Sequence, residues 1–166
     1  MSRGFVKEDD LEHAGTDLPE RPISQHPNYV TTNGYALLQA EAERLTNEIA
    51  RLSSRKEEAS VQQRLAVLNR DLRYVSARLE SALQTKPDEA SSQVLFAAKV
   101  TVENDVGIRN TYEIVGEDEA DIKLNKVSWT SPLAKALIGH KVGDSVVWQR
   151  PAGNTILEIL DIHYCR

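Results

Sequence analysis

The sequence contains few of the residues on which several protein classes depend. Its single cysteine, Cys165, excludes an internal disulfide and offers no spacing for a metal site. Aromatic residues make up only 5% of the chain, and no apolar run is long enough to cross a bilayer. Residues 1–8 also lack the apolar stretch of a signal peptide. With a formal net charge of −5, we expect a cytoplasmic protein that neither enters membranes nor binds DNA by itself.

The patterns that carry enzyme chemistry are missing as well. None of the histidines has a cysteine, serine or carboxylate at the spacing of a catalytic triad. They are His13, His26, His140 and His163. The chain also has no glycine-rich phosphate loop and no dinucleotide-binding motif. We therefore predict that it is not an enzyme, and that it has no catalytic residue, cofactor or metal site of its own.

What the sequence does contain is a long apolar seam whose members alternate in steps of three and four residues. This is the a/d pattern of a heptad repeat, which places apolar side chains along one face of a helix. The seam of a first arm comprises Leu38, Ala42, Leu45, Ile49 and Leu52. The seam of a second arm comprises Val61, Leu65, Leu68, Leu72, Val75, Leu79 and Ala82. Because only the short polar stretch 53–60 separates them, we predict an antiparallel coiled-coil hairpin.

The ends of the two arms have signals of their own. Thr31 or Thr32 can cap the first arm, which we expect to end near residue 54. Ser54 and Glu57 have capping-box spacing, which predicts that the second arm begins there and runs to about residue 84.

Proline and charge patterns divide the rest of the chain. Residues 1–28 carry a charge of −3, contain Pro19, Pro22 and Pro27 and have no apolar period, so we predict a flexible tail. The coiled-coil hairpin then covers residues 29–85. Lys86-Pro87-Asp88 begins a linker over residues 86–93, and a C-terminal domain covers residues 94–166.

The C-terminal part changes to the period of two that is typical of strands. Strand-like segments cover 94–102, 108–115, 145–149 and 155–163, with turns between them. One short helix follows Ser131, which can cap it, with Pro132 at its first position. We predict an α+β chain in which the hairpin precedes a small, mostly antiparallel sheet with one short helix.

The polar residues of the hairpin leave two further hypotheses open. Glu57 and Glu58 at the tip could help to hold Mg²⁺, although solvation and capping are the stronger explanation, and Arg55 and Lys56 neutralise them locally. Basic residues of the second arm could follow a nucleic-acid backbone, although they do not form one stripe. These are Arg64, Arg70, Arg73 and Arg78.

Several motifs, in the same order along the chain, resemble those of the bacterial Gre transcription elongation factors, the GreA/GreB-like family. In the hairpin these are Val30-Thr31-x-x-Gly34-Tyr35-x-x-Leu38 and Arg73-Tyr74-Val75-x-x-Arg78-Leu79-Glu80. In the C-terminal part they are Val102-Glu103-Asn104-Asp105-x-Gly107, Tyr112-x-Ile114-Val115-Gly116-x-Asp118-Glu119, Ser131-Pro132-Leu133-Ala134-Lys135-Ala136-Leu137, Lys141-Val142-Gly143-Asp144 and Pro151-Ala152-Gly153. Together the resemblance covers residues 29–166.

The resemblance implies a C-terminal domain similar in fold to FK-binding-protein-type prolyl isomerases, here a small antiparallel sheet domain. In the family this domain docks on bacterial RNA polymerase and the hairpin enters the secondary channel. Ser131, Pro132 and Leu133 match the family's docking segment, with Thr130 in place of its usual aspartate. The implied partner is RNA polymerase, with nucleic acid only inside the transcription complex, and we expect the chain to act as a monomer.

The resemblance fails at the tip, which comprises Arg55, Lys56, Glu57 and Glu58. Family members that stimulate transcript cleavage carry the motif Asp-x-x-Glu-Asn there, and this chain lacks it between Leu52 and Val61. Its hairpin also looks shorter, by roughly seven residues or about 10 Å per arm, which is similar to Rnk-type relatives. We therefore expect a regulator that occupies the channel without stimulating cleavage. Two alternatives are cleavage stimulation through Glu57 and Glu58, and prolyl isomerase or chaperone activity of the C-terminal domain.

Overall fold

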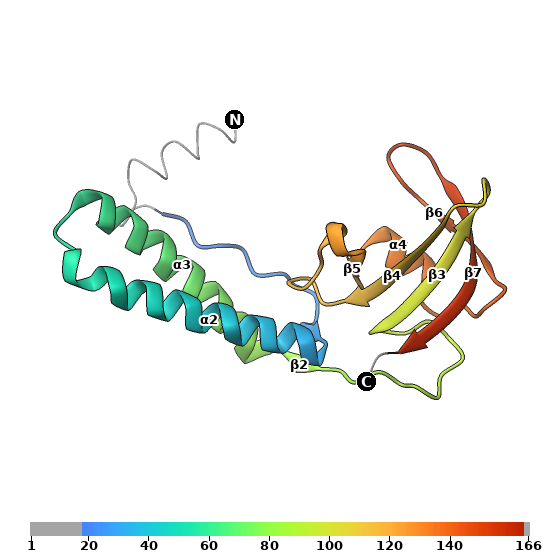
Figure 1. Cartoon of the computed structure of the whole chain (residues 1–166), viewed down its shortest axis with the longest axis horizontal. Coiled ribbons are helices and arrows are strands. Elements are labelled where there is room, and N and C mark those ends of the chain that lie inside the picture. The colour runs from blue at the N-terminus through green and yellow to red at the C-terminus, as the bar shows by residue number, and fades with distance from the viewer. Residues whose placement is uncertain (1–17, 165–166) are drawn as a thin grey trace. The chain divides into compact units, whose positions relative to one another are not determined.

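The computed structural model describes residues 18–164 and separates into two compact units (Figure 1). The hairpin unit consists of the described residues up to Pro27 together with Ala36–Ala82. The C-terminal unit consists of Asn28–Tyr35 and the described residues from Leu83 onward. The unit boundary therefore falls inside the first helix of the hairpin, whose first turn belongs to the C-terminal unit.

Two helices form the predicted hairpin: α2 (Thr32–Leu52) and α3 (Ala59–Ser81), joined by a 3-10 turn, η1 (Ser53–Arg55). The most deeply buried seam residues recur every seven positions, as a coiled coil requires. They are Leu38, Leu45 and Leu52 in α2 and Val61, Leu68 and Val75 in α3. The 21 residues of α2 and the 23 of α3 correspond to lengths of about 32 and 35 Å.

Of the two caps predicted for the hairpin helices, one is confirmed and the other is wrong. The backbone N–H of Gly34 donates to Oγ1 of Thr31 at 2.9 Å, so Thr31 caps α2. The capping box of Ser54 and Glu57 does not form, because both residues lie in the turn and α3 begins only at Ala59. The turn closes instead through the N–H of Glu58, which donates to the carbonyl of Arg55 at 3.0 Å.

Residues 18–27, which we call the N-terminal segment, have neither helix nor strand but make specific contacts with α3. The Arg73 guanidinium lies 2.6 Å from the carboxylate of Glu20, and the Arg21 guanidinium lies 3.8 Å from the ring centre of Tyr74. The sequence patterns gave no sign of these contacts, since they predicted a flexible tail over residues 1–28. Residues 1–17 of that tail lie outside the described residues.

A five-stranded sheet with the order β5-β4-β3-β7-β6 forms the centre of the C-terminal unit. Its strands are β3 (Ala98–Asn104), β4 (Arg109–Val115), β5 (Lys126–Ser128), β6 (Ser145–Trp148) and β7 (Thr155–Tyr164). Every neighbouring pair is antiparallel except β4 and β5, which are parallel. The prediction of a mostly antiparallel sheet is therefore confirmed.

The first strand of this sheet begins later than the sequence indicated. Residues 94–97 were expected to be part of it, but Ala97 has a positive φ of 74° and the strand begins at Ala98. Val94 is fully buried, yet it hydrogen-bonds with His140 and Gly139 after the short helix. Its apolar character thus reflects burial in the core rather than membership of the strand.

The helix α4 (Pro132–Leu137) packs against β5 and β6 and contributes to the core. Oγ of Ser131 accepts a hydrogen bond from the N–H of Ala134 at 3.2 Å, and Pro132 occupies the first turn. The predicted start of this helix is confirmed. The core is made of Val94, which precedes β3, and of apolar residues from α4 and the strands: Ala98, Val100, Val102, Ile114, Leu133, Ala134, Leu137, Val146, Leu157 and Ile159.

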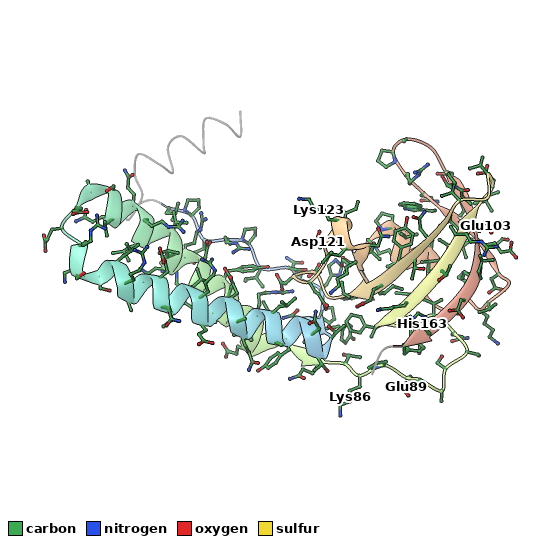
Figure 2. All side chains as sticks on the ribbon, viewed as in Figure 1. Lys86, Glu89, Glu103, Asp121, Lys123 and His163 are labelled. Carbon is green, nitrogen blue, oxygen red and sulfur yellow. The ribbon has the colours of Figure 1, made fainter. Side chains whose placement is uncertain are left out.

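A second 3-10 turn, η2 (Ile122–Leu124), lies between β4 and β5. Asp121 caps it by accepting a hydrogen bond from the backbone N–H of Lys123 at 3.0 Å, and Figure 2 shows both side chains at this turn. Asn125 ends the turn in the left-handed conformation. The turn leaves the side chain of Ile122 in solvent, with the residue 85% exposed.

A small parallel pair, β1 (Tyr29–Val30) and β2 (Leu83–Gln84), brings together the two segments that lead into and out of the hairpin. Across residues 18–164, no helix combines the length and apolarity needed to span a membrane.

Candidate functional site

The hairpin tip is exposed to solvent, and two of its charged residues form an ion pair. All residues from Ser53 to Ser60 are exposed. A guanidinium nitrogen of Arg55 lies 2.8 Å from a carboxylate oxygen of Glu58, and the two side chains are 57% and 51% exposed. Lys56 and Glu57 are exposed on the same turn. One of the two tip carboxylates is therefore already engaged by a cation of the tip itself.

This arrangement does not fit the hypothesis of a Mg²⁺ ligand pair at Glu57 and Glu58. Mg²⁺ is held by oxygen ligands at short, nearly octahedral distances, and a guanidinium on one carboxylate competes with the metal for that oxygen. Between residues 18 and 164, no three His, Cys, Asp or Glu side chains gather in a way that could hold a metal ion.

The three residues predicted to dock have different environments. Pro132 is exposed, and Ser131 is half-buried with its hydroxyl used as the cap of α4. Leu133 is only 3% exposed and belongs to the core. Leu133 therefore packs mainly inside the unit, and docking through these three residues stays a prediction.

Beside Pro132 the surface of the C-terminal unit contains an apolar groove with a volume of about 260 Å³. We call it the apolar groove. It is lined by Tyr112, Ile122, Asn125, Val127, Ser131, Pro132, Leu133 and Trp148. The rings of Tyr112 and Trp148 meet edge to face with their centres 6.3 Å apart. The groove thus has two half-buried aromatic walls and the exposed Ile122 at its edge.

Sequence reasoning found Ser131 and Pro132 but missed Ile122 and Asn125 as members of this surface. The only signal for Ile122 was an apolar residue between charged neighbours, which is common on protein surfaces. Thr130, which replaces the family's aspartate, exchanges a hydrogen bond of 2.7 Å with the hydroxyl of Ser128. Its side chain is therefore engaged within the unit.

The arginines of α3 do not form a surface for nucleic acid. Arg78 is buried, with 1% of its surface exposed. Arg73 pairs with Glu20 of the N-terminal segment, and Arg70 lies 3.4 Å from Asp71. Burial of Arg78 and local pairing of Arg70 and Arg73 argue against the hypothesis that these residues follow a nucleic-acid backbone.

The architecture is a helical hairpin with an exposed tip, followed by a small sheet domain with an apolar surface groove. Comparison with known proteins identifies the family. Residues 89–164 match the family model described as "Transcription elongation factor, GreA/GreB, C-term". Transcription elongation factor GreB of Neisseria meningitidis serogroup B is 36% identical over 155 residues, which cover 84% of this chain and 95% of that protein. The chain belongs to the GreA/GreB family of transcription elongation factors.

Other relatives match over the C-terminal part or by fold. GreA of Pelobacter propionicus is 54% identical over 80 residues, 48% of each chain. Among solved structures, the Gfh1 protein of Thermus thermophilus aligns with a TM-score of 0.40 and 23% identity, over 83% of this chain and 99% of that one. A GreA/GreB factor from Nitrosomonas europaea aligns with a TM-score of 0.41 and 21% identity, over 82% and 99%. Both TM-scores are under 0.5, so the family assignment depends on the sequence matches.

Proposed function

We propose that this chain binds bacterial RNA polymerase, docks through the apolar groove and inserts its hairpin into the secondary channel without stimulating transcript cleavage. Membership of the elongation factor family supports polymerase as the partner. The groove, the hairpin and the tip each support one part of the proposal.

The composition of the groove supports its role in docking. Binding energy at protein interfaces is concentrated in a few residues, often tryptophan and tyrosine, that lie in pockets from which water is excluded. Tyr112 and Trp148 supply such walls, and Ile122 gains burial only when a partner covers it. Pro132 adds a rigid, exposed edge beside them.

The shape of the hairpin supports insertion. Its cross-section is that of two packed helices, and its longer arm measures about 35 Å along the axis. The exposed faces carry ion pairs between neighbouring turns, such as Arg44 with Glu41 and Arg51 with Glu48. A slender prong with a solvated surface can enter an aqueous channel without first exposing its apolar seam.

The pairing of Arg55 with Glu58 is the observation that carries the non-cleaving part of the proposal. Stimulation of a two-metal reaction requires carboxylate oxygens free to bind the second ion. The tip has one carboxylate held by arginine, a second one beside Lys56, and no Asp-x-x-Glu-Asn motif. The tip therefore presents a locally neutral surface where cleaving relatives present an acidic one.

The first experiment follows RNA length in backtracked elongation complexes of bacterial RNA polymerase. We expect full-length RNA after incubation with this protein, and shortened RNA with a cleaving relative such as a GreB. Prior addition of this protein should slow cleavage by the relative, because both occupy one channel. Shortened RNA with this protein alone, abolished in Glu57→Gln or Glu58→Gln, would establish the cleavage-stimulating alternative instead.

The second experiment tests the groove with Ile122→Glu. This residue is 85% exposed, so the change should leave folding intact while placing a charge at the apolar edge. We expect the Kd for polymerase to rise by about tenfold or more, since a charge buried against apolar groups costs well over 1 kcal/mol. Ile156→Glu is the matched control, because this exposed residue on β7 points to the opposite face of the sheet from Leu157 in the core. Equal affinity of all three proteins would rule out docking at the groove.

A proline-peptide isomerisation assay checks the remaining hypothesis for this groove. We expect no acceleration over the uncatalysed rate, and a clear acceleration lost in Ile122→Glu would establish an isomerase.

A further inference from the structure

The two segments that connect the hairpin to the C-terminal unit are held together by backbone hydrogen bonds. We call residues 28–35 and 83–85 the root. The N–H of Leu83 donates to the carbonyl of Asn28 at 2.8 Å, and the N–H of Thr85 donates to the carbonyl of Val30 at 2.9 Å. Both segments belong to the C-terminal unit. The incoming and outgoing chains therefore cannot separate without breaking this pairing.

The incoming segment of the root, residues 28–35, also packs directly on the rest of the C-terminal unit. The ring of Tyr29 lies edge to face with Trp129 at 5.1 Å and 6.0 Å from Phe96. A side chain at Gly116 would collide with the carbonyl oxygen of Tyr29, so only glycine allows this approach.

The most specific contact of the root is made by Glu119. Its side chain is only 2% exposed. One carboxylate oxygen accepts a hydrogen bond of 2.5 Å from Oγ1 of Thr31, and the other accepts one of 2.9 Å from Nδ2 of Asn33. The Lys126 ammonium lies 3.3 Å away, and a Cβ on Gly34 would lie 2.7 Å from the same carboxylate.

The physical chemistry of this contact makes it selective for one arrangement. A buried carboxylate is costly unless donors and a cation surround it, and here two of the three donors lie at the start of α2. The N-terminus of a helix also favours a negative charge, because its free N–H groups carry partial positive charge. The buried charge of Glu119 therefore has its full set of hydrogen-bond donors only while the first turn of α2 stays in place.

We propose that Glu119 is the positioning residue of the hairpin: it fixes the first turn of α2 to the docking unit, so that docking delivers the tip into the channel. The inference rests on the proposed function. The first turn of α2 continues directly into the helix Thr32–Leu52, so the contact with Glu119 joins the C-terminal unit to the chain that forms the first arm. Without this anchor, the docked protein would hold its hairpin in many directions.

The experiment measures delivery of the tip at matched occupancy of the polymerase. A photo-crosslinker is attached to Ser54→Cys, an exposed tip position, in a Cys165→Ser background that leaves no other thiol. Crosslinking to polymerase is then compared for the parent protein, Glu119→Gln and Asn33→Ala. The concentration of each protein is chosen so that the same fraction of polymerase is bound. Glu158→Gln, an exposed carboxylate on β7, is the matched control.

We expect the tip crosslink to fall about fivefold or more in Glu119→Gln, which loses a charge-assisted hydrogen-bond network, and less in Asn33→Ala, which loses one donor. Asn33 is exposed, so its variant stays folded even where Glu119→Gln is destabilised. The control should crosslink like the parent. Equal crosslinking by all four proteins would overturn the role of Glu119 while leaving insertion intact. Absence of a crosslink from the parent at full occupancy would instead overturn insertion itself.

Discussion

The hairpin tip and the C-terminal unit use the same charged residue types in opposite ways. At the tip, Glu58 is about half exposed and pairs with one arginine across a single turn. In the C-terminal unit, the side chain of Glu119 is almost completely buried and bonded to groups far away in the sequence. An exposed ion pair contributes about 0–1 kcal/mol, whereas removing one partner of a buried one costs about 3–5 kcal/mol. The comparison shows that the tip is free to vary chemically, whereas the C-terminal unit depends on particular residues.

The largest expected effect separates core from surface within the docking segment. Leu133→Ala should lower the free energy of unfolding by about 2–5 kcal/mol, because it leaves a cavity in the core of the C-terminal unit. Pro132→Ala, at the exposed neighbouring position, should change it by less than about 1 kcal/mol. Both tryptophans, Trp129 and Trp148, lie in this unit, so their fluorescence during urea unfolding measures its stability. Equal effects of the two changes would contradict the burial of Leu133.

The next effect concerns the root. Gly116→Ala should cost about 1–3 kcal/mol, since the new methyl group meets backbone of Tyr29 that cannot move without disturbing the β1–β2 pair. Gly107→Asn is a suitable control, because a Cβ there meets nothing within 4 Å and asparagine tolerates a positive φ. The same fluorescence measurement applies, and a Gly116 variant as stable as the control would argue against the close approach.

A smaller, local effect is expected where the N-terminal segment contacts α3. The hydrogen bond from Arg73 lowers the pKa of Glu20 below its ordinary value of 4.5. A lowered pKa in the folded state means that the contact stabilises the segment above pH 4.5 and is lost as the pH falls through the lowered value. Amide exchange or NMR shifts of residues 18–27 should report this release on acidification. Glu20→Gln should remove that pH dependence, and an unchanged profile would assign the transition to another group.

The smallest effect is expected at the tip. Arg55→Ala should change the free energy of unfolding by about 0.5 kcal/mol or less, because the pair with Glu58 is exposed and within one turn. Thermal unfolding followed by circular dichroism at 222 nm would measure it, since the hairpin supplies most of the helix. A loss comparable to that of Leu133→Ala would show that the tip is a structural element and would break the comparison.

Much of the fold was predictable because its signals are local. The seam from Leu38 to Val75, the cap at Thr31 and the start of α4 at Ser131 and Pro132 all depend on residues a few positions apart. The last predicted seam residue, Ala82, lies beyond the end of α3 at Ser81. The proposed docking segment was suggested by its resemblance to the family. The capping box predicted at Ser54 does not form, because Ser54 and Glu57 lie in the turn between the two helices. The local spacing of residues does not show where this turn falls.

The sequence by itself determined that this protein has a heptad hairpin, a separate sheet domain and a tip without the acidic cleavage motif. Periodicity and caps act over one or two turns of chain, so composition and spacing are enough to specify them. Only the tertiary structure decided that Leu133 is a core residue, that Ile122 joins an apolar groove, and that Glu119 holds a helix 88 positions earlier in the chain. The physical reason is that burial and desolvation depend on neighbours in space, and the folded topology alone chooses those neighbours.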